Sequence, residues 1–367
     1  MLPVILGALG ALVLAGLGYF LRGQRLIKKA RAIEAETEAM DAQRGDASAA
    51  LGFVPAEQLD TEHGRKPEPG EEAVRAAVHA GDWQAAATWL EEAGKDWEER
   101  FQRTRLLARE AAEDDAWLLA WRAAAPEDAG AAVVHADAEV AVAWNVRGTK
   151  RASHTSREQF RIFHQLLGRA QEAAHEAQRL AGADDPVPYM VEQAIALGLG
   201  YEHERYRQLW AQIVSRAPRV VTAHNHALQY WCRKWQGSHE LALAFAKESA
   251  AVGKPGDLLT FIPLCAYFEH EQHESDIDPD IFYKSPDIVA AVDAALADAA
   301  VCAPGDLRLV WVRHMLAWLL FWQDRYEEAV EQLRHVDGWI GEAPWTYSGD
   351  PVDRYTNVRD YCARQVL

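Results

Sequence analysis

The residues best suited to chemistry lie in one acidic stretch near the middle of the second half of the chain. Imidazole and carboxylate groups are the ligands that zinc and calcium bind in proteins. A cluster of them could serve a metal-dependent hydrolase, in which the metal activates a water molecule. The candidate ligands in this stretch are His270, His273, Asp276, Asp278 and Asp280.

The spacing of these residues departs from the metal motifs that they suggest. The segment HEQHE does not place two histidines four residues apart around a catalytic glutamate, as HExxH does. Asp276-x-Asp278-x-Asp280 begins like a calcium loop, but Ile281 stands where that loop needs glycine, and Asp287 replaces its bidentate glutamate. We therefore favour a solvated acidic loop and assign no metal ligand, with the metal-dependent hydrolase kept as an alternative function.

Other polar residues also have structural explanations. His224 lies on an apolar stripe, which predicts a buried core histidine, whereas His226 lies off that stripe. Ser238 follows a glycine and precedes a helical pattern, so we interpret it as a helix N-cap, because no GxSxG motif surrounds it. The sequence has no phosphate-binding loop or GxGxxG motif. We predict that the protein is not an enzyme and has no cofactor.

A helical period organises the segment 189–252. Apolar residues recur there at i, i+3, i+4 and i+7, which is typical of α-helices and argues against strands. Each predicted helix has about a dozen residues, too few to be stable alone, so each must bury its stripe against a neighbour. The same pattern extends over residues 70–367, and we predict one all-α domain, an irregular α-solenoid of helical hairpins.

Helix-boundary signals punctuate the second half of this domain. Ser285 followed by Pro286 predicts the start of a helix. Asp324 and Glu327 form a pair like a capping box, which predicts the start of the next helix nearby. The aromatic tail after Gly338 is expected to cover the final hairpin, because a solenoid needs a cap at its end.

The N-terminus predicts a membrane anchor and a tether. Residues 2–21 are uncharged and long enough, as a helix, to cross the hydrocarbon core of a bilayer. A cleaved signal peptide would need a charged segment before the apolar run. Residues 22–43 are predicted to form a charged helix. Residues 44–69 are rich in Gly, Pro and charge and are predicted to form a flexible linker. Five basic residues follow the span, and by the positive-inside rule they keep the body cytoplasmic: Arg22, Arg25, Lys28, Lys29 and Arg31.

Small residues repeat every four positions within the predicted span. Gly7, Ala11 and Ala15 form a small-xxx-small face that could pair two such helices. Small residues are also simply common in membrane helices, which is the alternative explanation. A purely structural, self-associating membrane protein is therefore a third functional hypothesis.

Composition argues against some classes of ligand and some roles for the tryptophans and cysteines. The net charge of −17 argues against nucleic-acid binding, because a basic surface is what neutralises phosphates. The 14 tryptophans, at helical spacing, are expected to be hairpin-interface residues. The 4 cysteines form no CxxC pair and no disulfide framework, which fits a reducing compartment.

Several short phrases resemble known helical repeats. Ala317-x-x-Leu320 followed by Tyr326-x-x-Ala329 resembles a tetratricopeptide repeat. Three further phrases resemble an uncharacterised bacterial family of tetratricopeptide-like domains. They are AGDWQAAATWL, Trp144 with Arg147-Gly148, and Gly237-Ser238 within KWQGS. No repeat carries the full tryptophan–leucine–glycine–tyrosine series. The resemblance covers roughly residues 70–340 and implies a helical-repeat fold and a role in protein binding, without any site residue.

These observations favour a single-pass membrane protein with a cytoplasmic helical-repeat domain. We expect it to act as a scaffold or adaptor for an unidentified protein or peptide, held at the lipid bilayer through residues 2–21. The sequence does not name that partner.

Overall fold

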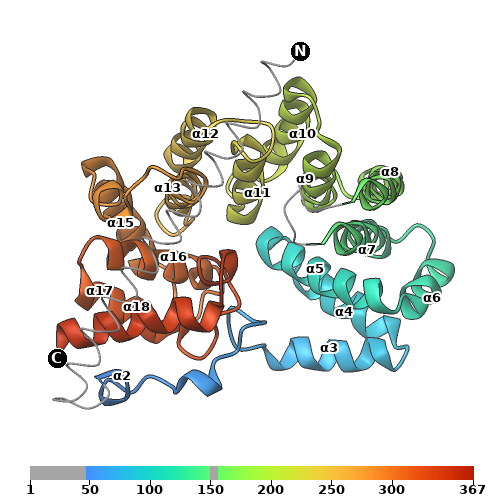
Figure 1. The fold of residues 1–367 in the computed structure, drawn as a ribbon. Coiled ribbons are helices and arrows are strands. Elements are labelled where there is room, and N and C mark those ends of the chain that lie inside the picture. Colours follow the sequence, from blue (N-terminus) through green and yellow to red (C-terminus); the bar gives the residue numbers. More distant parts are fainter. Residues whose placement is uncertain (1–46, 149–155) are drawn as a thin grey trace. The chain divides into compact units, whose positions relative to one another are not determined.

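The computed structural model describes residues 47–148 and 156–367 and shows an all-α protein of packed helical hairpins (Figure 1). These residues form no strand, which confirms the all-α part of the prediction. The anchor predicted over 2–21, the charged helix over 22–43 and the face of Gly7, Ala11 and Ala15 lie outside the described residues. No helix among the described residues is long and apolar enough to cross a membrane.

The chain divides into two compact units where the sequence predicts one domain over 70–367. We call Pro67–Val252 the central unit. Residues 47–66 and Gly253–Leu367 together form the terminal unit. The segments that precede and follow the central unit in the sequence therefore belong to one body. Helical periodicity does not reveal this division, because the GKPGDL segment after Val252 resembles the CAPGDL segment between two helices of the terminal unit.

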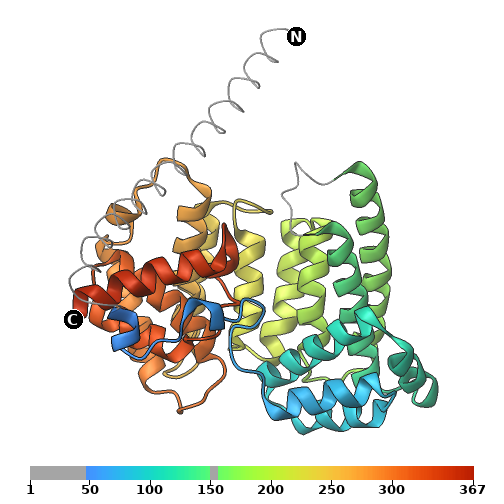
Figure 2. The same ribbon diagram turned by 60° about the horizontal axis from the view of Figure 1, so that its bottom comes forward.

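The central unit contains ten of the described helices, most of which pack against their sequence neighbours. In the view of Figure 2, α7, α8 and α9 stand side by side while α3 runs across their ends. The helices are α3 (Pro69–His79), α4 (Trp83–Glu92), α5 (Trp97–Glu113), α6 (Ala116–Ala124), α7 (Ala129–Arg147), α8 (Arg157–Leu180), α9 (Val187–Leu199), α10 (His203–Arg216), α11 (Val221–Trp231) and α12 (His239–Val252).

Side-chain caps fix where several of these helices begin. The carboxylates of Asp82 and Asp128 accept hydrogen bonds from the amides of residues three positions later, at 3.1 and 2.9 Å. Ser156 caps α8 in the same way at 3.1 Å. Ser238 accepts from the amide of Leu241 at 3.2 Å, which confirms the predicted N-cap. Each cap satisfies an amide that the helix itself leaves without a partner.

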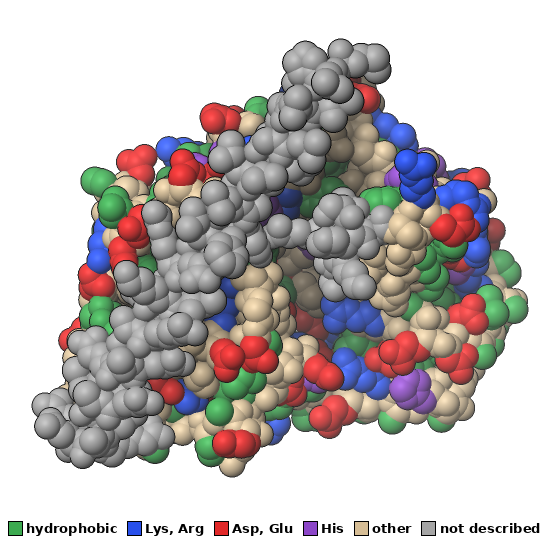
Figure 3. Space-filling view, in the orientation of Figure 1, with side chains coloured by type: hydrophobic (Ala, Val, Ile, Leu, Met, Phe, Trp, Pro, Cys, Tyr) green, Lys and Arg blue, Asp and Glu red, His purple; other side chains and the backbone are tan. Residues whose placement is uncertain are grey.

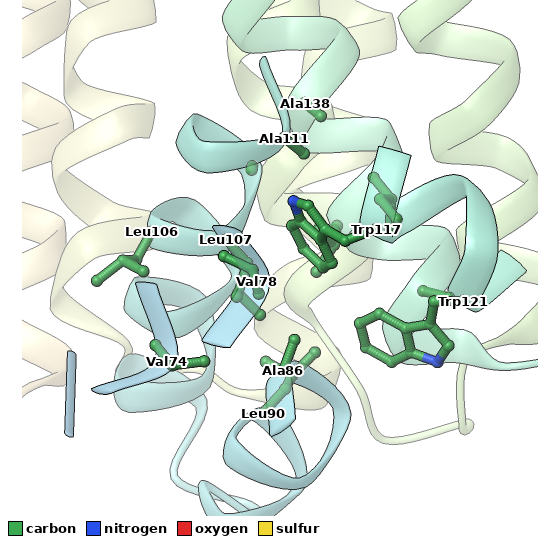
Figure 4. Packing of buried hydrophobic residues seen from close by; sticks show 14 residues of the cluster. Val74, Val78, Ala86, Leu90, Leu106, Leu107, Ala111, Trp117, Trp121 and Ala138 are labelled. Atoms are coloured by element: carbon green, nitrogen blue, oxygen red, sulfur yellow. The ribbon is translucent and has the colours of Figure 1, made fainter. Parts of the chain in front are cut away.

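A hydrophobic cluster holds the first five helices of the central unit together (Figure 4). Trp117 and Trp121 of α6 are 3 and 1 % exposed and lie against side chains from α3, α4 and α5. Trp83 at the start of α4 stacks on Trp121, with ring centroids 6.1 Å apart. These tryptophans are therefore hairpin-interface residues, as their spacing predicts.

The terminal unit is built around α16, whose apolar side chains are buried on most sides. The aromatic tail forms a helix, α18, that packs on α17 and α16, so the predicted cap is present. The elements are α2 (Ala47–Ala50), η1 (Ala56–Gln58), α13 (Phe261–His273), α14 (Pro279–Phe282), α15 (Pro286–Ala300), α16 (Leu309–Trp322), α17 (Tyr326–Val336), η3 (Trp345–Tyr347) and α18 (Pro351–Val366).

The two predicted helix starts in this unit have different outcomes. Ser285 precedes α15, which begins at Pro286 as predicted. The capping box at Asp324 is wrong, because α17 begins at Tyr326 and Asp324 adopts a φ of 59°. The Asp324 carboxylate instead pairs with Lys284 and accepts the Tyr326 hydroxyl at 2.7 Å. A left-handed turn thus takes the place of a cap.

Residues 47–66, which we call the strap, are ordered against the terminal unit. The prediction of a flexible linker over 44–69 therefore differs from what the structure shows for this part of it. The Asp60 amide donates to Gly338 at 2.8 Å, and the Ile340 amide donates back to Asp60 at 2.7 Å. The Gly341 amide donates to His63 at 2.9 Å. These bonds satisfy backbone groups of the strap although it is neither helix nor strand. The sequence therefore shows no hydrophobic periodicity that would predict its order.

Side chains of the last two helices fix the other half of the strap. The Val54 amide donates to Asp337 at 2.7 Å, and Arg359 donates to the Val54 carbonyl at 2.8 Å. Ser48 donates to Asp360 at 2.6 Å. In Figure 2 the strap and α2 run beside α18, in agreement with these contacts.

His314 connects the strap to the core of the terminal unit. Its side chain is fully buried on α16. The Nε2–H group donates to the Gly64 carbonyl at 3.0 Å, and Nδ1 accepts the indole N–H of Trp345 at 2.8 Å. Burial lowers the pKa of His314 to about 4, so the imidazole stays neutral at pH 7 and keeps this tautomer.

We expect His314→Ala to destabilise the terminal unit by about 3 kcal/mol, through a cavity and two unsatisfied buried groups. Hydrogen exchange should increase over residues 60–66 first. The folded-state pKa lies below the unfolded value of 6.5, so the contribution of His314 is present above pH 6.5 and is lost as the pH falls toward 4. Urea unfolding at pH 7 and pH 5 measures both effects. His335→Ala, at a 43 % exposed histidine, is the control, and an equal loss there would refute this role.

Candidate functional site

Helix α5 connects helices of the central unit that are far apart in sequence. It packs on α7 and also contacts α9. The buried Glu98 carboxylate accepts the Thr222 amide at 3.1 Å and the Thr222 hydroxyl, at the first turn of α11. A carboxylate is stabilised there because the N-terminus of a helix carries partial positive charge. These contacts bring the polar residues of α5 next to those of α7 and α11.

About two turns further along α5, charged and aromatic side chains from three helices meet. We call this set the Arg105 cluster. The Arg105 Nε atom lies 3.6 Å from Oδ2 of Asp137 on α7. Phe101 packs edge-on against the ring of His226 on α11, with centroids 5.5 Å apart, and the Arg105 guanidinium lies over the Phe101 ring at 5.9 Å. The cluster consists of Phe101, Arg105, Arg109, Asp137 and His226.

The carboxyl group of Asp137 is buried, which disfavours its charged form. Its side chain is 4 % exposed, and Oδ2 has no hydrogen-bond partner. Burial raises the pKa of the Asp137 carboxyl, and the charges of Arg105 and Arg109 oppose this shift only in part. The charged form of Asp137 is therefore disfavoured by folding, although it lies beside two arginines.

His226 is the neutral member of the cluster. Burial and the positive charge of Arg105 together lower the pKa of His226 to about 3. The imidazole is therefore uncharged at pH 7 and can donate one N–H group without adding positive charge. The cluster thus holds two cations, one carboxylate and one neutral donor.

The arginines of the cluster reach solvent. The Arg105 side chain is 34 % exposed, and Arg109 is exposed. On the face shown in Figure 3, basic side chains lie over α5 among interspersed acidic ones. Guanidinium groups bind carboxylates through paired, charge-assisted hydrogen bonds. The cluster is therefore suited to recognition of an anionic group.

The structure places the predicted metal ligands apart, at α13, α14 and the loop between them. The His270 ring packs against Phe282, with centroids 5.4 Å apart. His273 Nδ1 lies 2.9 Å from the Glu269 carbonyl. Among the described residues, no group of three or more histidine, cysteine, aspartate or glutamate side chains could hold a metal ion.

The acidic residues of the same segment have local positions. Asp278 is the N-cap of α14, where its carboxylate accepts the amide of Asp280 at 3.0 Å. Asp276 is exposed in the preceding loop. Asp278 therefore serves the start of a helix, as an aspartate at this position commonly does.

The two histidines of α11 have different surroundings. His224 is buried, as predicted, and donates through Nε2 to the Pro218 carbonyl at 2.9 Å. Its Nδ1 accepts the Ser249 hydroxyl at 2.8 Å. Ser249 is only 3 % exposed, so this serine–histidine contact has no access for a substrate. His226, predicted to lie off the stripe, lies in the Arg105 cluster.

Sequence analysis did not find Arg105 and Asp137. The signal was present in the α7 segment AAVVHADAEVAVA, where residues on several sides of the helix are apolar. An acid in such a segment can fall on a buried side of the helix, as Asp137 does, and a buried acid needs a cation. The identity of that cation depends on contacts between distant helices, which spacing does not reveal.

Comparisons with known proteins add no relative. No family model, curated protein or solved structure matches the chain. The structure itself therefore establishes an all-helical protein, without a family. Its function must be argued from the geometry of the Arg105 cluster.

Proposed function

We propose that this chain is a membrane-anchored adaptor whose central unit recruits a protein partner through the Arg105 cluster. In this proposal residues 2–21 span the membrane, the helical hairpins form an irregular tetratricopeptide-like solenoid, and the body lies in the cytoplasm. The chain acts by binding and performs no reaction.

The observation that carries the proposal is the buried Asp137 carboxylate beneath exposed arginines. An apolar side chain at this position would pack in α7 without the cost of burying a charge. Asp137 instead holds Arg105 at 3.6 Å, where the guanidinium remains partly exposed. An arrangement that lowers stability and presents a cation to solvent is typical of a binding surface.

The strap bears on the reach of the proposed adaptor. Because residues 47–66 belong to the terminal unit, most of the linker predicted over 44–69 is part of a folded body. A shorter linker would keep the adaptor near the bilayer.

Affinity capture from gently solubilised membranes tests the proposal. We expect the full-length chain to retain a stoichiometric partner, identified by quantitative mass spectrometry. The double variant Arg105→Gln with Arg109→Gln should retain at least about tenfold less, since two charge-assisted contacts are lost.

A matched double variant controls for charge. Arg157→Gln with Arg161→Gln removes two exposed arginines from α8 of the same unit and should capture the partner normally. Equal capture by both double variants would exclude the Arg105 cluster as the site. Absence of any stoichiometric partner from the wild-type chain would refute recruitment itself.

A further inference from the structure

We infer that the Arg105 cluster recognises the carboxylate side chains of an acidic segment in its partner. This inference rests on the proposed function and names the chemistry that the proposed site would select. The occupant is an Asp- or Glu-rich segment of another protein.

The geometry leaves donor capacity on the solvent side of Arg105. Asp137 approaches the guanidinium at Nε, from the buried side, at 3.6 Å. A guanidinium carries five N–H donors in a planar fork, so an approach at Nε leaves its terminal nitrogens for a bidentate carboxylate. Asp137 and the Phe101 ring restrict the movement of Arg105, which lowers the entropy lost when a ligand binds. Asp137 is therefore a positioning residue.

The charge balance of the cluster favours an anion. Arg105 and Arg109 both act electrostatically on the Asp137 carboxyl, and the neighbouring His226 is neutral. The chain as a whole carries a net charge of −17, which would repel an acidic partner at long range. At physiological salt that repulsion is screened beyond about 8 Å, whereas contacts at the guanidinium groups are not. Recognition of an acidic segment would therefore depend on direct contacts with the guanidinium groups.

His226 provides an independent reporter of the bound anion. Its pKa is lowered to about 3 by burial and by the charge of Arg105. A ligand carboxylate beside Arg105 would offset that positive charge, so binding at pH 7 should change the electrostatic environment of the His226 ring and its NMR signals. A structural role for the cluster would not produce this change.

Two labelled peptides test the inference on the full-length chain in detergent micelles. One is a fluorescein-labelled dodecapeptide of alternating Glu and Ser, and the other has Gln in place of Glu. By fluorescence anisotropy we expect the Glu peptide to bind at least about tenfold more tightly. Arg105→Gln with Arg109→Gln should abolish that preference, while Arg157→Gln with Arg161→Gln should preserve it. At pH 7 the Glu peptide should also shift the ring signals of His226, followed by NMR of labelled histidines and assigned with His226→Gln.

The outcomes separate this inference from the proposed function. Equal affinity for the two peptides, no binding of the Glu peptide, or a preference that survives in the Arg105/Arg109 variant would each overturn it. Capture of a partner that depends on the cluster but lacks an acidic segment would overturn the carboxylate inference alone. Failure to capture any partner would instead count against the adaptor role.

Discussion

Deleting residues 1–66 is expected to unfold the terminal unit while leaving the central unit folded. The strap forms an integral part of the terminal unit, since the Asp60 backbone pairs with residues 338 and 340 and Phe53 is 6 % exposed. The central unit, Pro67–Val252, has its own hydrophobic cluster and needs no residue of the strap for it. The two units should therefore respond differently to the same deletion.

The size of the effect follows from the groups that the strap satisfies. Its removal takes away hydrogen bonds to the Arg359 guanidinium, the Asp337 carboxylate and the buried His314 N–H group, and it also exposes the core that Phe53 covers. A hydrogen bond to a charged group, or to a buried group that is then left unsatisfied, is worth about 1–3 kcal/mol. The sum is comparable with the whole stability of a domain, about 5–15 kcal/mol. We therefore expect loss of the fold rather than a modest shift in its stability.

A chain lacking only residues 1–46 is the matched control, because it keeps the strap. Hydrogen exchange should show protected amides in α16, α17 and α18 of the control and none in the longer deletion. Helices α7, α8 and α9 should stay protected in both chains. Equal protection of α16–α18 in the two deletions would show that the strap contributes little to the terminal unit.

Local features of this fold are predictable from sequence because they depend on neighbouring residues. The 3.6-residue period predicts the hairpins, Ser238 predicts a helix start, and the apolar stripe around His224 predicts a buried histidine. Each of these signals is contained within a few turns of the chain. The structure confirms them for that reason.

Features that depend on distant contacts are not predictable in this way. The strap has no period because its backbone is satisfied by residues 338–341, nearly the whole chain away. The same limit applies to Arg105, whose partners lie on α7 and α11. Asp324 is a third case. As an aspartate near a helix start it suggests an N-cap, but its backbone adopts the left-handed region, with a φ of 59°. The candidate site belongs wholly to this second group.

Asp137→Asn is expected to stabilise the central unit by about 1 kcal/mol at pH 7 while weakening binding at the Arg105 cluster. Burial raises the pKa of Asp137 above its unfolded value, so the charged form opposes folding at neutral pH. The gain from Asn should be present above the folded-state pKa and absent below about pH 4, where Asp137 is protonated in both states. Urea unfolding at pH 7 and pH 4 measures this difference.

The same substitution should reduce affinity for the Glu–Ser peptide severalfold, because Arg105 loses the anion that positions it. Arg105 itself is 34 % exposed, so its guanidinium can turn toward water and need not remain as a buried unpaired charge. Glu158→Gln on α8, where a 63 % exposed acid pairs with Arg161, should change neither stability nor peptide affinity measurably. A loss of more than about 1 kcal/mol in Asp137→Asn at pH 7 would identify Asp137 as part of a stabilising ion pair. In that case the acid would no longer indicate a binding surface, and the case for recruitment at the Arg105 cluster would depend on the peptide measurements alone.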